Sequence, residues 1–215
     1  FLERGDISVI NKWDKTKIAL HYGVDLVIEL PFQFATQSAD IFAYGAIKIL
    51  TSLKANKLVF GSECNDIKFL SKLADTQIND PVFTEKLKEY MDTGINYPSA
   101  MSKALKDICG KTVNSPNDIL GLSYIKEIKK QKSKIKPISI KRTNSYKSID
   151  FNKKIVSALT IREAIRNNIS IQPYMPKYSL KFLDKTINKE KYFPLLKCKI
   201  ISEINCLDRY QTVDE

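Results

Sequence analysis

The sequence has few of the residues that build metal sites and disulfide frameworks. It contains a single histidine, His21, and its four cysteines, Cys64, Cys109, Cys198 and Cys206, form no C-x-x-C pair. A zinc site with the usual ligands is therefore not expected. Scattered cysteines are typical of small buried side chains in a reducing compartment. We expect a cytoplasmic protein without a metal site of its own.

Several motifs and long apolar runs are also missing. With one histidine and no G-x-S-x-G motif, a serine or cysteine nucleophile activated by a histidine base is not expected. Neither a P-loop nor a G-x-G-x-x-G fingerprint occurs. No apolar run approaches the roughly 20 residues that a membrane-spanning helix needs, so we expect no membrane association. None of these features specifies an oligomeric state.

Basic residues, in contrast, are abundant. Lysine and arginine number 35 against 24 acidic residues, which gives a net charge of +11. Such an excess attracts polyanions, most commonly nucleic acid, although a lysine-rich genome would raise the charge in the same way. Six lysines gather at one place: Lys126, Lys129, Lys130, Lys132, Lys134 and Lys136. A favourable helix C-terminus explains single lysines but not six, so we predict that they bind RNA.

The segment from 24 to 63 has the pattern of a parallel α/β unit. The apolar run 25–30 ends at Pro31 and predicts a buried strand, 36–53 has helical periodicity, and 57–60 predicts a second strand. A strand, a crossover helix and a strand are typical of an α/β sheet. Ligands of such sheets bind outside the carboxyl ends of the strands, so we expect a site near Gly61.

The rest of the chain predicts a helical insertion at about 66–112, a helix after Ser115, a strand at 135–142 and a helix after Ser157. The proline-containing segment 173–176 is the best candidate for a boundary. We therefore predict an α/β domain over residues 1–172 and the start of a helical domain over 173–215.

Several residues at the predicted strand ends and helix starts suit a nucleotide. Gly61 lets the backbone approach a ligand, and Asn117 lies in the first turn of its helix. Arg142 follows a strand and can neutralise phosphate, while Ser157 and Arg162 place a hydroxyl and a guanidinium at another helix start.

Carboxylates also lie near these strand ends. They are Glu29, Asp40, Glu63 and Asp66. Their spacing does not distinguish an acid/base role from a solvated surface.

Taken in order, these segments resemble tRNA(Met) cytidine acetate ligase, a family of the nucleotidyltransferase superfamily. The resemblance rests on DLVIELPFQFATQSA, FGSE, PNDILGL, IKPISIKR and SALTIREAI, which keep their order along the chain. It implies an α/β, Rossmann-like nucleotidyltransferase core, ATP (with Mg²⁺) as cofactor, and acetate and tRNA(Met) as substrates. Such enzymes form acetyl-adenylate and then acetylate N4 of the wobble cytidine.

By the same resemblance, Gly61, Asn117 and Arg142 bind ATP, with Ser157 and Arg162 on a second phosphate-binding motif. The superfamily's H-x-G-H motif does not occur in this sequence, so no catalytic residue is assigned. We expect that motif on a preceding segment, a further C-terminal region, and no activity from these 215 residues alone. Two alternatives remain open: a small-molecule adenylyltransferase of the same superfamily, and a non-catalytic RNA-binding α/β domain.

Overall fold

The computed structural model describes residues 8–143, 155–183 and 189–210. They belong to two compact units, one formed by 29–145 and the other by 1–28 together with 146–215. Each unit is described by itself, within these described residues.

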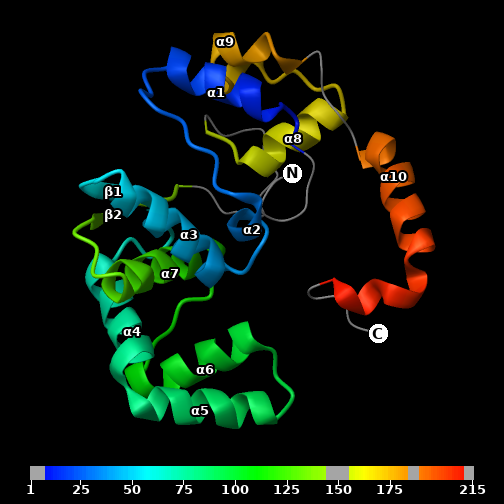
Figure 1. Cartoon of the computed structure of the whole chain (residues 1–215). Helices are drawn as coiled ribbons and strands as arrows, with labels where there is room; N and C mark the ends of the chain where they lie inside the picture. Colours follow the sequence, from blue (N-terminus) through cyan, green and yellow to red (C-terminus); the bar gives the residue numbers. More distant parts are fainter. Residues whose placement is uncertain (1–7, 144–154, 184–188, 211–215) are drawn as a thin grey trace. The chain divides into compact units, whose positions relative to one another are not determined.

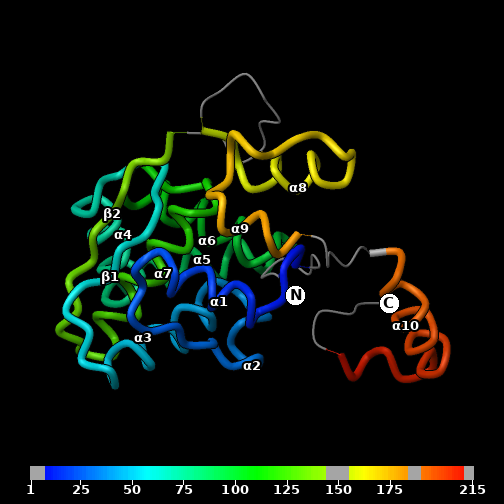
Figure 2. Tube along the Cα trace, turned by 90° about the horizontal axis from the view of Figure 1, so that it is seen from above, coloured from blue at the N-terminus to red at the C-terminus, as the bar shows by residue number. Residues whose placement is uncertain are grey.

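The unit 29–145 is built on two strands, β1 (Lys57–Ser62) and β2 (Lys136–Lys141). They pair in parallel, from Lys57 opposite Lys136 to Ser62 opposite Lys141, and run side by side in Figures 1 and 2. Because both strands point the same way, their carboxyl ends lie at one edge of the sheet. The predicted second strand and the strand at 135–142 are confirmed.

Six helices accompany this sheet, in the order α2 (Phe32–Ala35), α3 (Ala39–Ser52), α4 (Ile67–Asn79), α5 (Pro81–Asp92), α6 (Tyr97–Cys109) and α7 (Pro116–Lys130). The side chains of Asp66, Asp80 and Asn96 accept hydrogen bonds from the first turns of α4, α5 and α6, as N-cap residues do. The three helices α4 to α6 occupy the span predicted for a helical insertion, and Figure 1 shows α5 and α6 lying side by side.

Helix α7 is the centre of this unit, because it packs against α3, α4 and β1. The largest apolar cluster consists of Leu70, Leu73, Ala74, Phe83, Met101, Ala104, Leu105, Val113, Leu122 and Ile125. A smaller one joins Ile47, Ile128 and Ile135. A Cβ on Gly121 would lie 2.5 Å from the ring of Phe60, so glycine allows α7 to approach β1 closely. This contact fixes the start of α7 beside the end of β1.

The buried strand predicted at 25–30 is wrong. Residues 24–30 belong to no strand, and Leu26 is 64% exposed. An apolar run becomes a strand only if a neighbouring strand takes its backbone hydrogen bonds, and among the described residues β1 pairs with β2 alone. The predicted helix at 36–53 is confirmed as α3, which begins at Ala39 after the short helix α2.

The second unit contains α1 (Lys12–His21), α8 (Ala158–Arg166), η1 (Gln172–Tyr174), α9 (Lys177–Leu180), α10 (Lys189–Ser202) and η3 (Ile204–Arg209). The side chains of Asn11 and Ser157 accept backbone hydrogen bonds as N-caps at the starts of α1 and α8, and the predicted helix after Ser157 is present. Gly23 follows α1 with φ +94°, the left-handed conformation expected there. The division of the chain into domains at residue 173 stays a prediction.

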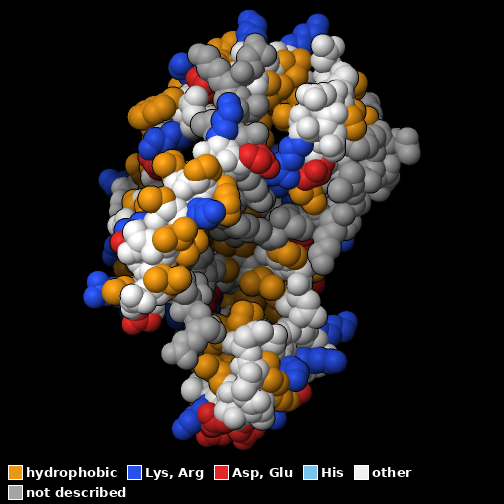
Figure 3. Space-filling model, turned by 90° about the vertical axis from the view of Figure 1, so that its right-hand side faces the viewer, with side chains coloured by type: hydrophobic (Ala, Val, Ile, Leu, Met, Phe, Trp, Pro, Cys, Tyr) orange, Lys and Arg blue, Asp and Glu red, His pale blue; other side chains and the backbone are white. Residues whose placement is uncertain are grey.

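Apolar side chains are exposed in both units. Figure 3 shows hydrophobic side chains interspersed with lysine and arginine over the visible face. Trp13, on α1, is 68% exposed. Within the residues that the structure describes, none of the helices is both long and apolar enough to cross a membrane.

Candidate functional site

Asp118, in the first turn of α7, anchors the carboxyl end of β1. Its carboxylate accepts hydrogen bonds from Ser62 Oγ at 2.5 Å and from the backbone N–H groups of Glu63 and Cys64, each at 3.0 Å. Ser115 Oγ donates a further bond at 2.5 Å. The side chain of Asp118 thus holds the turn after β1 against the N-terminus of α7.

These hydrogen bonds set the charge of Asp118. Burial by itself would raise the pKa of this carboxyl group, but the bonds from Ser115, Ser62 and Cys64 together lower the pKa below its ordinary value. The positive end of the α7 dipole favours the same charged form. Asp118 is therefore a carboxylate at neutral pH.

Glu63, the residue after β1, joins two of the predicted ATP-binding residues. Its Oε1 accepts a hydrogen bond from Asn117 Nδ2 at 2.6 Å and lies 3.5 Å from Arg142 Nε. Its backbone oxygen accepts a 2.7 Å hydrogen bond from Lys141 Nζ. Within the described part of the chain, Glu63 Oε2 is buried and has no hydrogen-bond partner.

Gly61 lies under the side chain of Arg142. A Cβ built on Gly61 would meet Arg142 Cγ at 3.4 Å, so the arginine stem rests on the bare backbone of β1. Glycine leaves this part of the strand open to close contact. The structure therefore brings three sequence-predicted residues together around Glu63: Gly61, Asn117 and Arg142.

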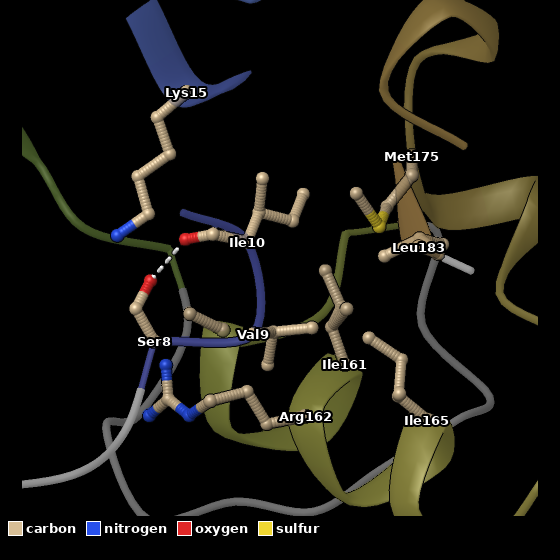
Figure 4. Close-up of a pocket in the computed structure, with 10 residues that line it drawn as sticks. Ser8, Val9, Ile10, Lys15, Ile161, Arg162, Ile165, Met175 and Leu183 are labelled. Carbon is tan, nitrogen blue, oxygen red and sulfur yellow. Dashed lines mark hydrogen bonds between the residues drawn. The ribbon is translucent and has the colours of Figure 1, made fainter. Parts of the chain in front are cut away.

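The other two predicted ATP-binding residues lie in the second unit. Ser157 caps α8 and accepts a hydrogen bond from the backbone of Thr160 at 3.1 Å. Arg162, one turn further, lines a cavity of about 200 Å³ together with Lys15 and apolar side chains (Figure 4). Its Nε is buried without a hydrogen-bond partner among the described residues. Burial lowers the pKa of Lys15. The ATP-binding roles of Ser157 and Arg162 stay predictions.

The six predicted RNA-binding lysines differ in their surroundings. Lys126 is 5% exposed and pairs with Asp40 at 2.7 Å, which indicates a structural role. Lys129 pairs with Asp75 at 2.7 Å, and Lys130 lies 3.9 Å from Glu127. The remaining three, called here the basic cluster, are exposed at the end of α7 and the start of β2; they are Lys132, Lys134 and Lys136. Their RNA-binding role stays a prediction.

Metal ligands do not gather in the described part of the chain. Its histidine, cysteine, aspartate and glutamate side chains form no group of three or more that could hold a metal ion.

The model of the family described as "HIGH Nucleotidyl Transferase" matches residues 1–215. The chain belongs to this family.

Curated members of the HIGH nucleotidyl transferase family with similar sequences carry the name tRNA(Met) cytidine acetate ligase. The protein from Clostridium perfringens strain ATCC 13124 is 40% identical over all of this chain and 58% of its own length. The protein from Caldicellulosiruptor saccharolyticus is 43% identical over 87% of this chain and 48% of its own length. The chain therefore spans about half the length of the curated relatives it matches.

A solved structure of this family confirms the predicted fold class. Thermotoga maritima TmcAL, without ligand, matches with a TM-score of 0.80 and 35% identity over 86% of this chain and 47% of its own. The same protein bound with alpha-thio ATP matches with a TM-score of 0.76 and 34% identity. The fold is the nucleotidyltransferase-like α/β fold expected from the sequence.

Asp118 is the residue of this site that the sequence interpretation missed. An aspartate three residues after Ser115, at the start of a helix that follows a strand, was the available signal. Its partners at the end of β1 lie 54 to 56 positions earlier in the chain, so spacing alone could not reveal these contacts.

Proposed function

We propose that this chain is part of an ATP-dependent ligase that acetylates the wobble cytidine of tRNA(Met), and that the surroundings of Glu63 hold the ATP. The observation that carries the proposal is the convergence of Gly61, Asn117 and Arg142 at one strand end. The relatives' name and the ATP analogue bound to the Thermotoga maritima protein support it.

The chemistry of each group suits one part of ATP. The backbone at Gly61 carries no side chain, so a flat or bulky group can approach it closely once the stem of Arg142 moves aside. Asn117, in the first turn of α7, offers an amide beside the positive end of the helix dipole. Arg142 carries a permanent charge and five donors, which match phosphate oxygens.

The proposed reaction needs these groups for positioning and charge stabilisation. An acetate oxygen attacks the α-phosphorus of ATP, pyrophosphate leaves, and acetyl-adenylate forms. The cytidine N4 amine then attacks the acetyl carbon, releasing AMP and a proton. Neither step needs a nucleophile from the protein, and positive charge near the phosphates lowers the barrier of the first.

Magnesium fits this scheme as part of the nucleotide substrate. Both oxygens of Asp118 already accept hydrogen bonds, so this carboxylate is not available as a metal ligand. Mg²⁺ commonly enters such sites on the phosphates, with few protein ligands.

The basic surface suits a tRNA substrate, because neutralising phosphates supplies much of the affinity for nucleic acid. The basic cluster contributes three exposed positive charges to it. Such a reaction takes place in the cytoplasm, where ATP and tRNA are present.

Two measurements test the proposal. ATP binding to the purified protein is expected to weaken about tenfold in Asn117→Ala and in Arg142→Ala, the loss of one good polar contact. Glu85→Ala, on the exposed side of α5, is the matched control and is expected to bind like the wild type. Unchanged ATP affinity in both site variants contradicts the assignment.

The second measurement is turnover. The product of the complete gene, given ATP, acetate and tRNA(Met), is expected to form acetylcytidine and pyrophosphate. ATP binding and pyrophosphate release with a small-molecule acceptor, without tRNA binding, would instead support an adenylyltransferase. tRNA binding without ATP binding would support a non-catalytic RNA-binding domain.

A further inference from the structure

Glu63 is the one carboxylate at the nucleotide site whose hydrogen-bonding capacity is incompletely used. Its Oε1 takes the amide of Asn117 and faces Arg142, whereas Oε2 is buried and has no donor among the described residues. The neighbouring Asp118 differs, because both of its oxygens accept hydrogen bonds. An orphaned buried acceptor is unfavourable and calls for an explanation.

Arg142 covers both Glu63 and Gly61. Its stem is 3.4 Å from the position of a Cβ on Gly61, and its Nε is 3.5 Å from Glu63 Oε1. That Nε is also buried without a hydrogen bond in the described part of the chain, so the ion pair is a loose one. A ligand that contacts the backbone at Gly61 must displace the arginine stem, and this movement uncovers Glu63.

A carboxylate accepts hydrogen bonds and donates none. The triphosphate of ATP carries acceptors and negative charge, so it is repelled by Glu63 and attracted by Arg142 and the N-terminus of α7. The donors of ATP are on its nucleoside half: the ribose hydroxyls and the amino group of adenine. Glu63 and Arg142 therefore favour opposite ends of the same ligand.

We propose, resting on the proposed function, that Glu63 determines nucleotide specificity. When the nucleotide binds, the carboxylate of Glu63 gives up its ion pair with Arg142 and accepts a hydrogen bond from the nucleoside. The freed guanidinium of Arg142 then binds phosphate. The nucleoside donor is a ribose hydroxyl or the amino group of adenine. The exchange keeps each of these half-buried charges paired, because Glu63 gains a donor as Arg142 gains an anion.

The test measures dissociation constants of the protein for ATP, 2′-deoxy-ATP, 3′-deoxy-ATP and inosine triphosphate by calorimetry. Wild type is expected to bind at least one analogue about tenfold more weakly than ATP, the loss of one hydrogen bond to a charged group. In Glu63→Ala that preference disappears, because ATP falls to the level of the analogue. The analogue concerned identifies the donor: a deoxynucleotide for ribose, inosine triphosphate for the adenine amine.

Glu63→Gln and Glu85→Ala complete the design. Glu63→Gln keeps the shape of the side chain and one acceptor oxygen, so it is expected to retain part of the preference for ATP over the analogue. Glu85→Ala, at an exposed position, is expected to retain the whole preference. Thermal unfolding of each variant checks that it folds. The inference is overturned if Glu63→Ala discriminates among the nucleotides as wild type does. It is equally overturned if this variant binds ATP more tightly, since Glu63 then only competes for Arg142. Absence of ATP binding by wild type is a separate result, which refutes the proposed function itself.

Discussion

Replacing Asp118 is predicted to lower the free energy of unfolding more than replacing an exposed carboxylate does. Its buried side chain, 3% exposed, receives Ser62 Oγ, Ser115 Oγ and two backbone N–H groups. Hydrogen bonds to a charged group contribute about 1.5–3 kcal/mol each, and a buried donor left without a partner costs about 1–3 kcal/mol. We expect Asp118→Ala to lower the free energy of unfolding by about 3–5 kcal/mol. Asp118→Asn should lower the free energy of unfolding by about 2 kcal/mol, because the amide NH₂ group, itself a donor, would face the hydroxyl and N–H donors that now bond the carboxylate.

Urea denaturation followed by circular dichroism measures this loss as a lower midpoint with an unchanged slope. The matched control is Asp75→Asn, whose carboxylate pairs with Lys129 at the surface and is 53% exposed. Exposed pairs contribute about 0–1 kcal/mol, so this variant should remain close to wild type. The reasoning is refuted if Asp118→Asn is as stable as Asp75→Asn.

The pH dependence gives an independent check on Asp118. Its pKa in the folded state is lowered, so the stabilisation is complete above the unfolded value of about 4. It is lost as the pH falls through the folded pKa, because the unfolded chain then binds the proton more readily. The stability difference between wild type and Asp118→Asn should therefore shrink below pH 4. A difference that stays constant down to pH 2.5 would point to a steric cause.

Three further variants test other contacts. Lys126→Met leaves Asp40 without its buried partner and should cost about 2–3 kcal/mol in urea unfolding, whereas adding Asp40→Asn should restore part of the loss. Gly121→Ala places a methyl group 2.5 Å from Phe60, and this overpacking should lower the free energy of unfolding by about 1–3 kcal/mol, measured as lower midpoints in urea and in a thermal melt. Changing all three lysines of the basic cluster to glutamine should weaken tRNA binding. It should also reduce the slope of log binding constant against log salt concentration by about two, measured by filter binding over a salt series. An unchanged salt slope would show that these lysines do not contact phosphate.

Local chemistry explains what the sequence could predict. The helix predicted after Ser157 is present, because the serine side chain bonds the first turn of its own helix, as Asn11 and Asp80 also do. The first of the two paired strands was recognisable as a short apolar run at 57–60, and the second from the alternation of apolar and polar residues at 135–142. Gly61 and Arg142 could be placed at strand ends for the same reason.

Long-range contacts explain what the sequence could not predict. The apolar run at 25–30 has the composition of a strand, but pairing with another strand is not encoded in its own residues. Lys126 was predicted to bind RNA, yet α7 packs on several sides and buries it beside Asp40. The bonds of Asp118 to the end of β1 join segments that no local pattern connects.

The parallel pairing of β1 with β2 has a consequence for folding. Lys141 and Glu63, which meet at the end of the sheet, are 78 positions apart in the chain. Four helices lie between them, so the strands can pair only after a long loop has closed, and such closure slows folding. The surroundings of Glu63 therefore depend on the closure of this long loop. A ligand that binds there would favour the closed, folded state by mass action.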